Sequence, residues 1–144
     1  MAFLLDTNVI SELVRPRPDE GVVRWTRAQR SLDVSLSVLT LGEIEKGLGI
    51  MSRGARHDEL VRWLYAELPR QFVGRLLPID LPVAQRWGQL AAEASASGRP
   101  LPVIDGLLLA TASVAGFTFV TRNVSDCARR GVPVYDPWLD VLYE

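Results

Sequence analysis

The stretch that decides the fold is LLDTN, residues 4–8, close to the start of the chain. Its two leucines end an apolar run, AFLL at 2–5, that is typical of a strand entering a protein core. The run stops abruptly at Asp6, which is followed by two small polar residues. Such a carboxylate either begins a helix or belongs to a functional site. One acid does not decide between the two, so the answer depends on acids in equivalent places elsewhere in the chain.

Short apolar runs alternate with segments of helical periodicity along the whole sequence. Strands that alternate with helices predict an α/β domain, in which a central, mainly parallel sheet is covered by helices on both faces. The predicted architecture therefore has three layers, α/β/α. We expect strands at 2–5, 34–38, 76–79, 117–120 and 132–135, and helices at 7–14, 40–50, about 55–73, about 82–97 and about 103–115, with a loop at 15–20.

The bulk composition predicts one domain over residues 1–144. At 144 residues and 48% hydrophobic content the chain can bury a substantial core, but it is too short for two comfortable domains. The net charge of -1 gives no global attraction to nucleic acid. The cations are nevertheless almost all arginines, with Lys46 the single lysine, and arginine suits bidentate contacts to phosphate. Local anion-binding surfaces are therefore compatible with the composition.

Targeting signals and redox chemistry are not indicated. No basic segment precedes the first apolar run, and no later stretch approaches the roughly 20 apolar residues of a membrane span. The single cysteine, Cys127, excludes an internal disulfide and a cysteine-based metal site. We therefore expect a cytoplasmic protein with no membrane association.

Four acids stand at equivalent places in this pattern. Asp6 follows the first strand, Glu43 lies in the first turn of the helix after the second strand, Asp105 lies in the first turns of the helix from about 103, and Asp126 follows the strand at 117–120. In an open parallel sheet, ligands bind beyond the carboxyl ends of the strands, where the next helices begin. The pattern predicts that the four carboxylates converge on one rim.

Each acid also has a structural explanation. Thr40 and Glu43 have the spacing of a capping box, Asn123 and Asp126 have the same separation, and Asp6 is in position to cap the helix at 7–14. Each such cap would stabilise the protein by about 1 kcal/mol. Taken singly, the two explanations are equally good. If the four acids meet, however, carboxylates about 4 Å apart would repel by roughly 4 kcal/mol per pair at an effective dielectric of 20. A fold tolerates such repulsion only with a bound cation.

The donor types indicate which cation would fit. All-carboxylate sites suit Mg²⁺, with Mn²⁺ as an alternative, and no cluster of histidine or cysteine points to zinc. A divalent cation held in this way can activate water, orient a phosphodiester and offset charge on the leaving oxygen. Hydrolysis of a phosphodiester is the reaction that this chemistry favours.

The chain resembles the PIN-domain ribonucleases, in particular the VapC/FitB-like toxins of bacterial toxin–antitoxin pairs. The resemblance is specific because the first acid, a glutamate in a T-x-G-E context, an acid in an L-P-x-x-D context and a closing T-R-N segment occur together in the family's order. The stretches that carry it are LLDTNVISEL (4–13), SVLTLGEIEKG (37–47), GRPLPVIDGLLLATA (98–112) and TRNVSD (121–126).

The resemblance implies a PIN-like fold and a Mg²⁺-dependent ribonuclease site. Asp6, Glu43 and Asp105 match the core acids, and Asp126 resembles the fourth, although some members carry an acid where this chain has Asn123. Either residue could therefore complete the metal site. The residues that match the family's supporting polar groups are Thr7, Asn8, Thr121 and Asn123. The position after Asp126 is often aromatic in relatives but is Cys127 here.

The resemblance also implies partners: an RNA substrate, a second copy of the chain in a homodimer, and a small cognate antitoxin. Arg122 lies between two of the predicted site residues, where a guanidinium could meet an RNA phosphate.

His57 lies in a charged segment and is expected to be solvated. Aromatic residues are expected in the core or a dimer interface rather than stacked on bases, namely Trp25, Trp63, Trp87 and Trp138.

Two other functions were compared with this one. Phosphatases of the haloacid dehalogenase type also begin with a strand ending in Asp, but they need a second Asp two residues later, where this chain has Asn8. The stronger alternative is a catalytically inactive PIN-like module that binds protein or RNA. The presence of all the acids argues against it.

Overall fold

The computed structural model describes residues 1–144 and contains one six-stranded sheet in the order β3-β2-β1-β4-β5-β6. The first five strands are mutually parallel, and the last one pairs antiparallel with β5 at the edge. The prediction of a central, mainly parallel sheet is confirmed. The strands are β1 (Phe3–Leu5), β2 (Val34–Ser37), β3 (Leu76–Leu77), β4 (Thr118–Val120), β5 (Val134–Asp136) and β6 (Val141–Tyr143).

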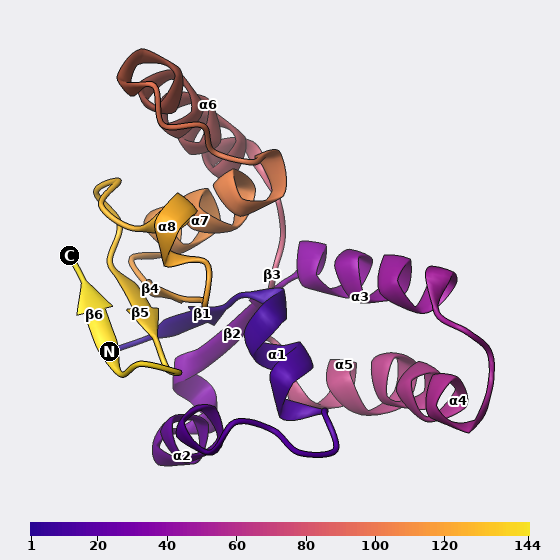
Figure 1. Cartoon of the computed structure of the whole chain (residues 1–144). Coiled ribbons are helices and arrows are strands. Elements are labelled where there is room, and N and C mark those ends of the chain that lie inside the picture. The colour runs from indigo at the N-terminus through magenta and orange to yellow at the C-terminus, as the bar shows by residue number, and fades with distance from the viewer.

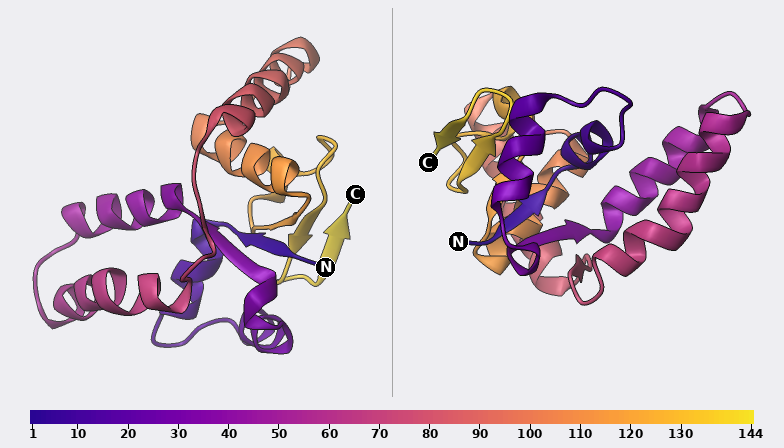
Figure 2. Two further views of the ribbon diagram at one scale, coloured as in Figure 1. Left: turned by 180° about the vertical axis from the view of Figure 1, so that it is seen from behind. Right: turned by 90° about the horizontal axis from the view of Figure 1, so that it is seen from below.

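Helices cover both faces of this sheet, so the three-layer architecture is also confirmed (Figures 1 and 2). One face packs against α6, α7 and α8, and the other against the helices from the first half of the chain. The helices are α1 (Thr7–Leu13), α2 (Glu20–Ala28), α3 (Val38–Ile50), α4 (Ala55–Arg62), α5 (Leu68–Gln71), α6 (Leu81–Ser97), α7 (Val103–Ala115) and α8 (Val124–Cys127). None of them is both long and apolar enough to cross a membrane.

The central position of β1, between two hydrophobic clusters, explains why its sequence is apolar throughout. Phe3 and Leu5 point into one hydrophobic cluster and Leu4 into the other, as the two-residue period of a strand requires. All three side chains are buried, with Leu4 fully inaccessible to solvent. Burial on both faces removes the usual alternation of polar and apolar residues. The polar residues that follow β1 are therefore placed at the edge of a buried sheet.

Several predicted elements have different bounds. The strand expected at 76–79 is limited to Leu76–Leu77, because Pro78 has no N–H to donate to the sheet. The single helix expected at 55–73 is divided into three consecutive segments: α4, a π-helical turn at Trp63–Glu67, and α5. The π-helical turn lies just before Pro69, which cannot donate an intrahelical hydrogen bond. The short α8 and the edge strand β6 were not predicted.

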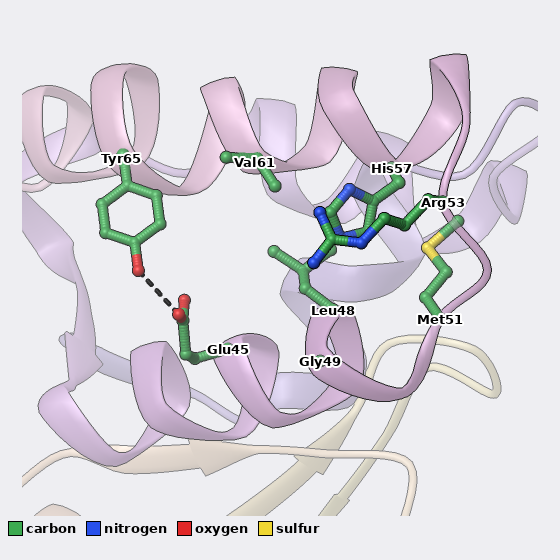
Figure 3. A pocket seen from close by; sticks show the side chains of 8 residues that line it. All are labelled: Glu45, Leu48, Gly49, Met51, Arg53, His57, Val61 and Tyr65. Carbon is green, nitrogen blue, oxygen red and sulfur yellow. Dashed lines mark hydrogen bonds between the residues drawn. The ribbon is translucent and has the colours of Figure 1, made fainter.

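Helices α3 and α4 lie side by side and project from the sheet as an arm (Figures 1 and 2). Between them lies a cavity of about 340 Å³ (Figure 3). His57 is one of its lining residues, and only 13% of its side chain is exposed. The expectation that His57 is solvated is wrong, because it lies on the inner face of α4, in a helical stripe with Leu60 and Leu64.

The tryptophans pack as expected against the hydrophobic core. Trp25, Trp63 and Trp138 lie against the cluster on the α1–α5 face, and Trp87 lies against the opposite cluster. Cys127 is fully buried in that second cluster, where burial raises the pKa of its thiol well above the ordinary value. A packing role for Cys127 is the result, and the thiol is not available as a nucleophile.

Candidate active site

Asp6 lies at the junction between β1 and α1, and it has both of the roles that the sequence suggested. Its Oδ1 accepts from the backbone N–H of Thr7 at 2.7 Å, which caps α1. Its Oδ2 accepts from the hydroxyl of Thr121 at 2.7 Å and from the amide of Asn8 at 3.3 Å. Asp6 is 5% exposed. Asp6 therefore caps α1 with one oxygen and takes part in the candidate site with the other.

Glu43 is not part of a capping box. Helix α3 begins at Val38, two residues before the predicted start, and Ser37 is its N-cap through a bond from the backbone N–H of Leu39 at 3.0 Å. Glu43 therefore lies beyond the first turn, where it accepts from the hydroxyl of Thr7 at 2.5 Å. The capping explanation is wrong for Glu43. Its carboxylate is directed toward the residues that follow β1.

The sequence suggests Thr40 only as part of a capping box, but the residue belongs to the hydrogen-bond network of Thr7 and Glu43. It is fully buried, and its hydroxyl oxygen lies 3.1 Å from that of Thr7. The sequence contained a signal for this role, because Thr40 precedes Glu43 by about one helical turn and so shares a face of α3 with it. Thr7 thus connects two side chains of α3 to the end of β1.

Asp105 and Asp126 are joined by one amide group. Asn123 Nδ2 donates to Asp105 Oδ2 and to Asp126 Oδ2, each at 3.0 Å. Although Asn123 stands before α8, its side chain makes no capping bond there, so a capping box over 123–126 is not formed. The backbone N–H of Asn123 donates to the hydroxyl of Thr121 at 2.9 Å. Thr121 thereby links this pair to Asp6.

The four acids thus come from four separate segments and are joined by hydrogen bonds at one edge of the sheet. Their negative charges affect one another. Burial raises the pKa of Asp6 to about 6, with smaller contributions from the charges of Asp105 and Glu43, while the bonds from Thr121 and Thr7 oppose the rise. Burial also raises the pKa of Asp105, as do the charges of Asp126 and Glu43.

The carboxylates are not as crowded as the sequence argument assumed. No three acidic side chains are close enough, in this arrangement, to hold one metal ion. The Thr7 hydroxyl and the Asn123 amide lie between them instead. No carboxylate of the site is paired with an arginine or lysine, since the arginine–carboxylate pairs of the protein involve Glu12, Asp33 and Glu59. Their charge is therefore uncompensated by the protein.

The donor set of the site fits a hard divalent cation. Asp105, Asp126 and Glu43 each use one carboxylate oxygen in the bonds described, and their second oxygens, Asp105 Oδ1, Asp126 Oδ1 and Glu43 Oε2, accept no hydrogen bond from the protein. Unused carboxylate oxygens without a neighbouring cation are the ligands that Mg²⁺ and Mn²⁺ prefer. The metal-binding and catalytic roles of these residues remain predictions.

Arg122 lies at this edge of the sheet and is exposed. Its guanidinium carbon is 5.1 Å from the centre of the Trp138 ring, and its backbone N–H donates to Asn8 Oδ1 at 3.4 Å. The side chain is thus supported by an aromatic ring and has no carboxylate partner. Its predicted contact to RNA remains a prediction.

Comparisons with known proteins agree with the resemblance seen in the sequence. A family model described as "PIN domain" matches residues 3–125. Toxin FitB of Neisseria gonorrhoeae is 37% identical over 138 residues, which cover 96% of this chain and 99% of FitB. VapC ribonuclease Y4jK of Sinorhizobium fredii is 37% identical over 136 residues, which cover 94% of this chain and 97% of the relative.

Solved structures show the same fold. The crystal structure of FitAcB from Neisseria gonorrhoeae contains a chain with a TM-score of 0.89 and 37% identity, over 94% of this chain and 98% of that one. The structure of FitAB bound to the IR36 DNA fragment contains one with a TM-score of 0.89 and 36% identity, over 94% and 95% of the two chains.

Proposed function

Because this chain belongs to the PIN domain family, whose model covers residues 3–125, we propose that it is a Mg²⁺-dependent endoribonuclease and the toxin of a toxin–antitoxin pair. The observation that carries the proposal is the hydrogen-bonded network that joins Asp6, Glu43, Asp105 and Asp126 at one edge of the sheet. A relative named as a VapC ribonuclease supports the reaction type.

The residues that would hold the cation are the four acids, with Mn²⁺ as an alternative to Mg²⁺. When bound, the ion would supply a positive charge that polarises water and offsets negative charge on the scissile phosphodiester. The chain's own groups keep the acids in place for this. Thr7 orients Glu43, Thr121 and Asn8 orient Asp6, and the Asn123 amide orients the other two acids. The carboxylates would move closer together when the ion binds, because no three of them are close enough to hold it in this arrangement.

The proposed substrate is single-stranded or looped RNA. Arg122 would bind a phosphate of that strand, since its guanidinium is exposed and already oriented by Trp138. No side-chain nucleophile is required, because the bound cation would supply activated water as the nucleophile. The acids would therefore act on water and phosphate, and no covalent enzyme intermediate would form.

Two partners belong to the proposal. We propose a small cognate antitoxin that keeps this chain inactive. The similarity to Toxin FitB and to a chain of a toxin–antitoxin complex from Klebsiella pneumoniae supports this partner. We also propose a homodimer, which the family resemblance implies.

The test is cleavage of labelled single-stranded RNA by the purified chain, freed of any partner, with and without Mg²⁺. We expect cleavage that needs the cation and that is lost in Asp6→Asn and Asp105→Asn, which preserve side-chain shape and remove one charge. Arg70→Gln, an exposed arginine of α5 away from the site, is the matched control and should cleave normally.

The main alternative is a catalytically inactive binding module. It predicts that the partner-free protein binds RNA or protein but cleaves no RNA with either cation. Cleavage that survives Asp6→Asn unchanged would instead indicate a contaminating nuclease.

A further inference from the structure

A second cavity, of about 230 Å³, lies between α6 and the segment that follows α8. Three of its six lining residues are arginines, and only one is acidic. We call this cavity the arginine pocket, and its lining residues are Leu90, Glu93, Ser97, Arg99, Arg129 and Arg130. The concentration of positive charge is unusual in a chain whose net charge is -1. It is not explained by the acidic site.

The three guanidinium charges have no counter-ion in the protein. The ion pairs of the structure involve Arg15, Arg30 and Arg56, and none involves the arginine pocket. Glu93 lies in the pocket wall without approaching any of the three arginines within ion-pair distance. Like charges in one cavity repel. An anion in the pocket would reverse this repulsion.

Two of the arginines also have structural bonds, but these leave donors unused. Arg99 donates to the carbonyl of Ala128 at 3.0 Å, and Arg130 Nε donates to that of Asp126 at 2.6 Å, which satisfies carbonyls around the end of α8. Arg99 Nε and Arg130 Nη1 donate to no group of the protein. The structural bonds therefore fix the guanidinium planes and leave free N–H groups.

Arg129 has no such structural bond. Its guanidinium donates to no protein group and lies 5.5 Å from the centre of the Tyr143 ring, and the side chain is exposed. Its backbone has a φ of 61°, in the left-handed region that an arginine rarely adopts. Apart from the contact with Tyr143, the guanidinium of Arg129 has no bond to the fold. Arg129 is the member of the pocket that most clearly points to a ligand.

The arginine pocket is directly connected to the candidate active site. The carbonyl of Asp126 accepts from Arg130, and the carboxylate of the same residue is bonded through Asn123 to Asp105. We propose that the arginine pocket binds a phosphate of the RNA strand whose scissile phosphate lies at the acidic site, an inference that rests on the proposed function. Planar guanidiniums with fixed orientation suit the oxygens of a phosphodiester.

The position of the pocket favours single-stranded RNA over other anions. A flexible strand can direct one phosphate into a cavity while its neighbours continue along the surface, whereas the phosphates of a duplex are held in a regular array. The connection through Asp126 also places the pocket beside the residues proposed to cleave RNA. Duplex DNA is the competing ligand, and the test separates it from single-stranded RNA.

The test is the salt dependence of RNA binding. Binding of a labelled single-stranded RNA is measured by fluorescence anisotropy with Mg²⁺ in an Asp6→Asn background, which we expect not to cleave. Arg129→Gly is the test variant, because glycine adopts a φ of 61° without strain. We expect binding about tenfold weaker at low salt, the equivalent of one charged hydrogen bond. The slope of log K against log salt should be shallower by about 0.7.

Two further variants and one further ligand make the result decisive. Arg129→Lys should restore part of the affinity, and Arg70→Gln should leave both the affinity and the slope unchanged. An unchanged affinity and slope in Arg129→Gly would overturn the pocket proposal, even if the protein with Asp6 intact cleaves RNA. An equal loss for duplex DNA of the same sequence would also overturn it. Failure of the unmodified protein to bind or cleave any RNA would overturn the proposed function together with the pocket.

Discussion

Asp6 is bonded on both oxygens, one to the start of α1 and the other to Thr121. Capping and site formation are therefore not exclusive alternatives at this residue. For Glu43 and for Asn123, by contrast, the structure excludes the capping bonds that the sequence spacing suggested. The difference arises because Asp6 directly follows a strand, whereas Glu43 lies two turns into a helix that Ser37 already caps.

The buried charge of Asp6 predicts a pH-dependent stability. Its pKa is about 6 in the folded protein, above the ordinary value of 3.8, so the folded state binds more protons than the unfolded state between these values. Without a cation, ionisation of Asp6 should therefore cost about 3 kcal/mol at pH 7, and this cost should disappear as the pH falls through about 6 toward 4.

Urea unfolding of the wild type and Asp6→Asn in EDTA measures this effect. We expect Asp6→Asn to be the more stable protein at about pH 7, and the difference to shrink by about pH 5 because Asp6 is then mostly protonated. Asparagine can still accept from the backbone N–H of Thr7, so the cap is preserved. A variant that is less stable at both pH values would show that the carboxylate contributes more through its hydrogen bonds than its burial costs.

At the scale of elements, the separate roles of Ser37 and Glu43 on α3 can be measured. Ser37→Ala removes the N-cap, so the free energy of unfolding should fall by about 1 kcal/mol while RNA cleavage per folded molecule stays normal. Glu43→Gln should abolish cleavage with little change in stability, because Glu43 makes no cap. Thermal unfolding and a cleavage assay on both variants check the two expectations. The reverse result would mean that Glu43 supports the helix and that Ser37 belongs to the site.

His57 gives a second prediction for the α3–α4 arm. Its Nδ1 is buried and has no hydrogen-bond partner, which costs roughly 1–3 kcal/mol for a polar group. His57→Leu fills a similar volume beside Leu48 and Val61 without a polar atom, so we expect it to raise stability by about 1 kcal/mol in chemical denaturation. His57→Gln, which keeps a polar group, is the control and should give no gain. A loss of stability in the leucine variant would mean that the imidazole has a partner in solution.

The sequence predicted the helices and strands with clear periodicity, and it failed where a local feature outweighed the pattern. Pro78 shortened β3, and Ser37 moved the start of α3 forward. The edge strand β6 was missed because its three residues have no buried periodic face, and α8 because it is a single turn. The inward position of His57 was not predicted, because the charged residues beside it made the segment look exposed. The helical spacing that His57 shares with Leu60 and Leu64 was therefore overlooked.

At the scale of the whole molecule, the positions of the four acids were predictable but their contacts were not. A parallel sheet brings the ends of its strands to one edge, so the topology alone places Asp6, Glu43 and Asp126 near each other. The amide of Asn123 between two carboxylates, and the hydroxyl of Thr7 beside a third, depend on rotamers that no spacing rule contains. The carboxylates consequently lie farther apart than their positions in the sequence suggest.

The uncompensated charge of the site predicts that a divalent cation stabilises the whole fold. If Mg²⁺ binds only the folded protein, a concentration of 100 times its dissociation constant should add about 2.7 kcal/mol to the free energy of unfolding. The melting temperature should therefore rise with Mg²⁺ in the wild type and much less in Asp105→Asn. Sodium chloride at the same ionic strength is the control. An equal rise with sodium would reduce the effect to general screening and remove the support for a bound ion.

The central position of β1 has a consequence for how the protein is made. β1 leaves the ribosome well before one of its two neighbours, β4, and before the Thr121 that holds Asp6, which are translated more than 110 residues later. A nascent or prematurely terminated chain thus contains the first acids without the groups that orient them. A nuclease of this design would be harmless to the message it is being translated from until β4 and Thr121 have been made.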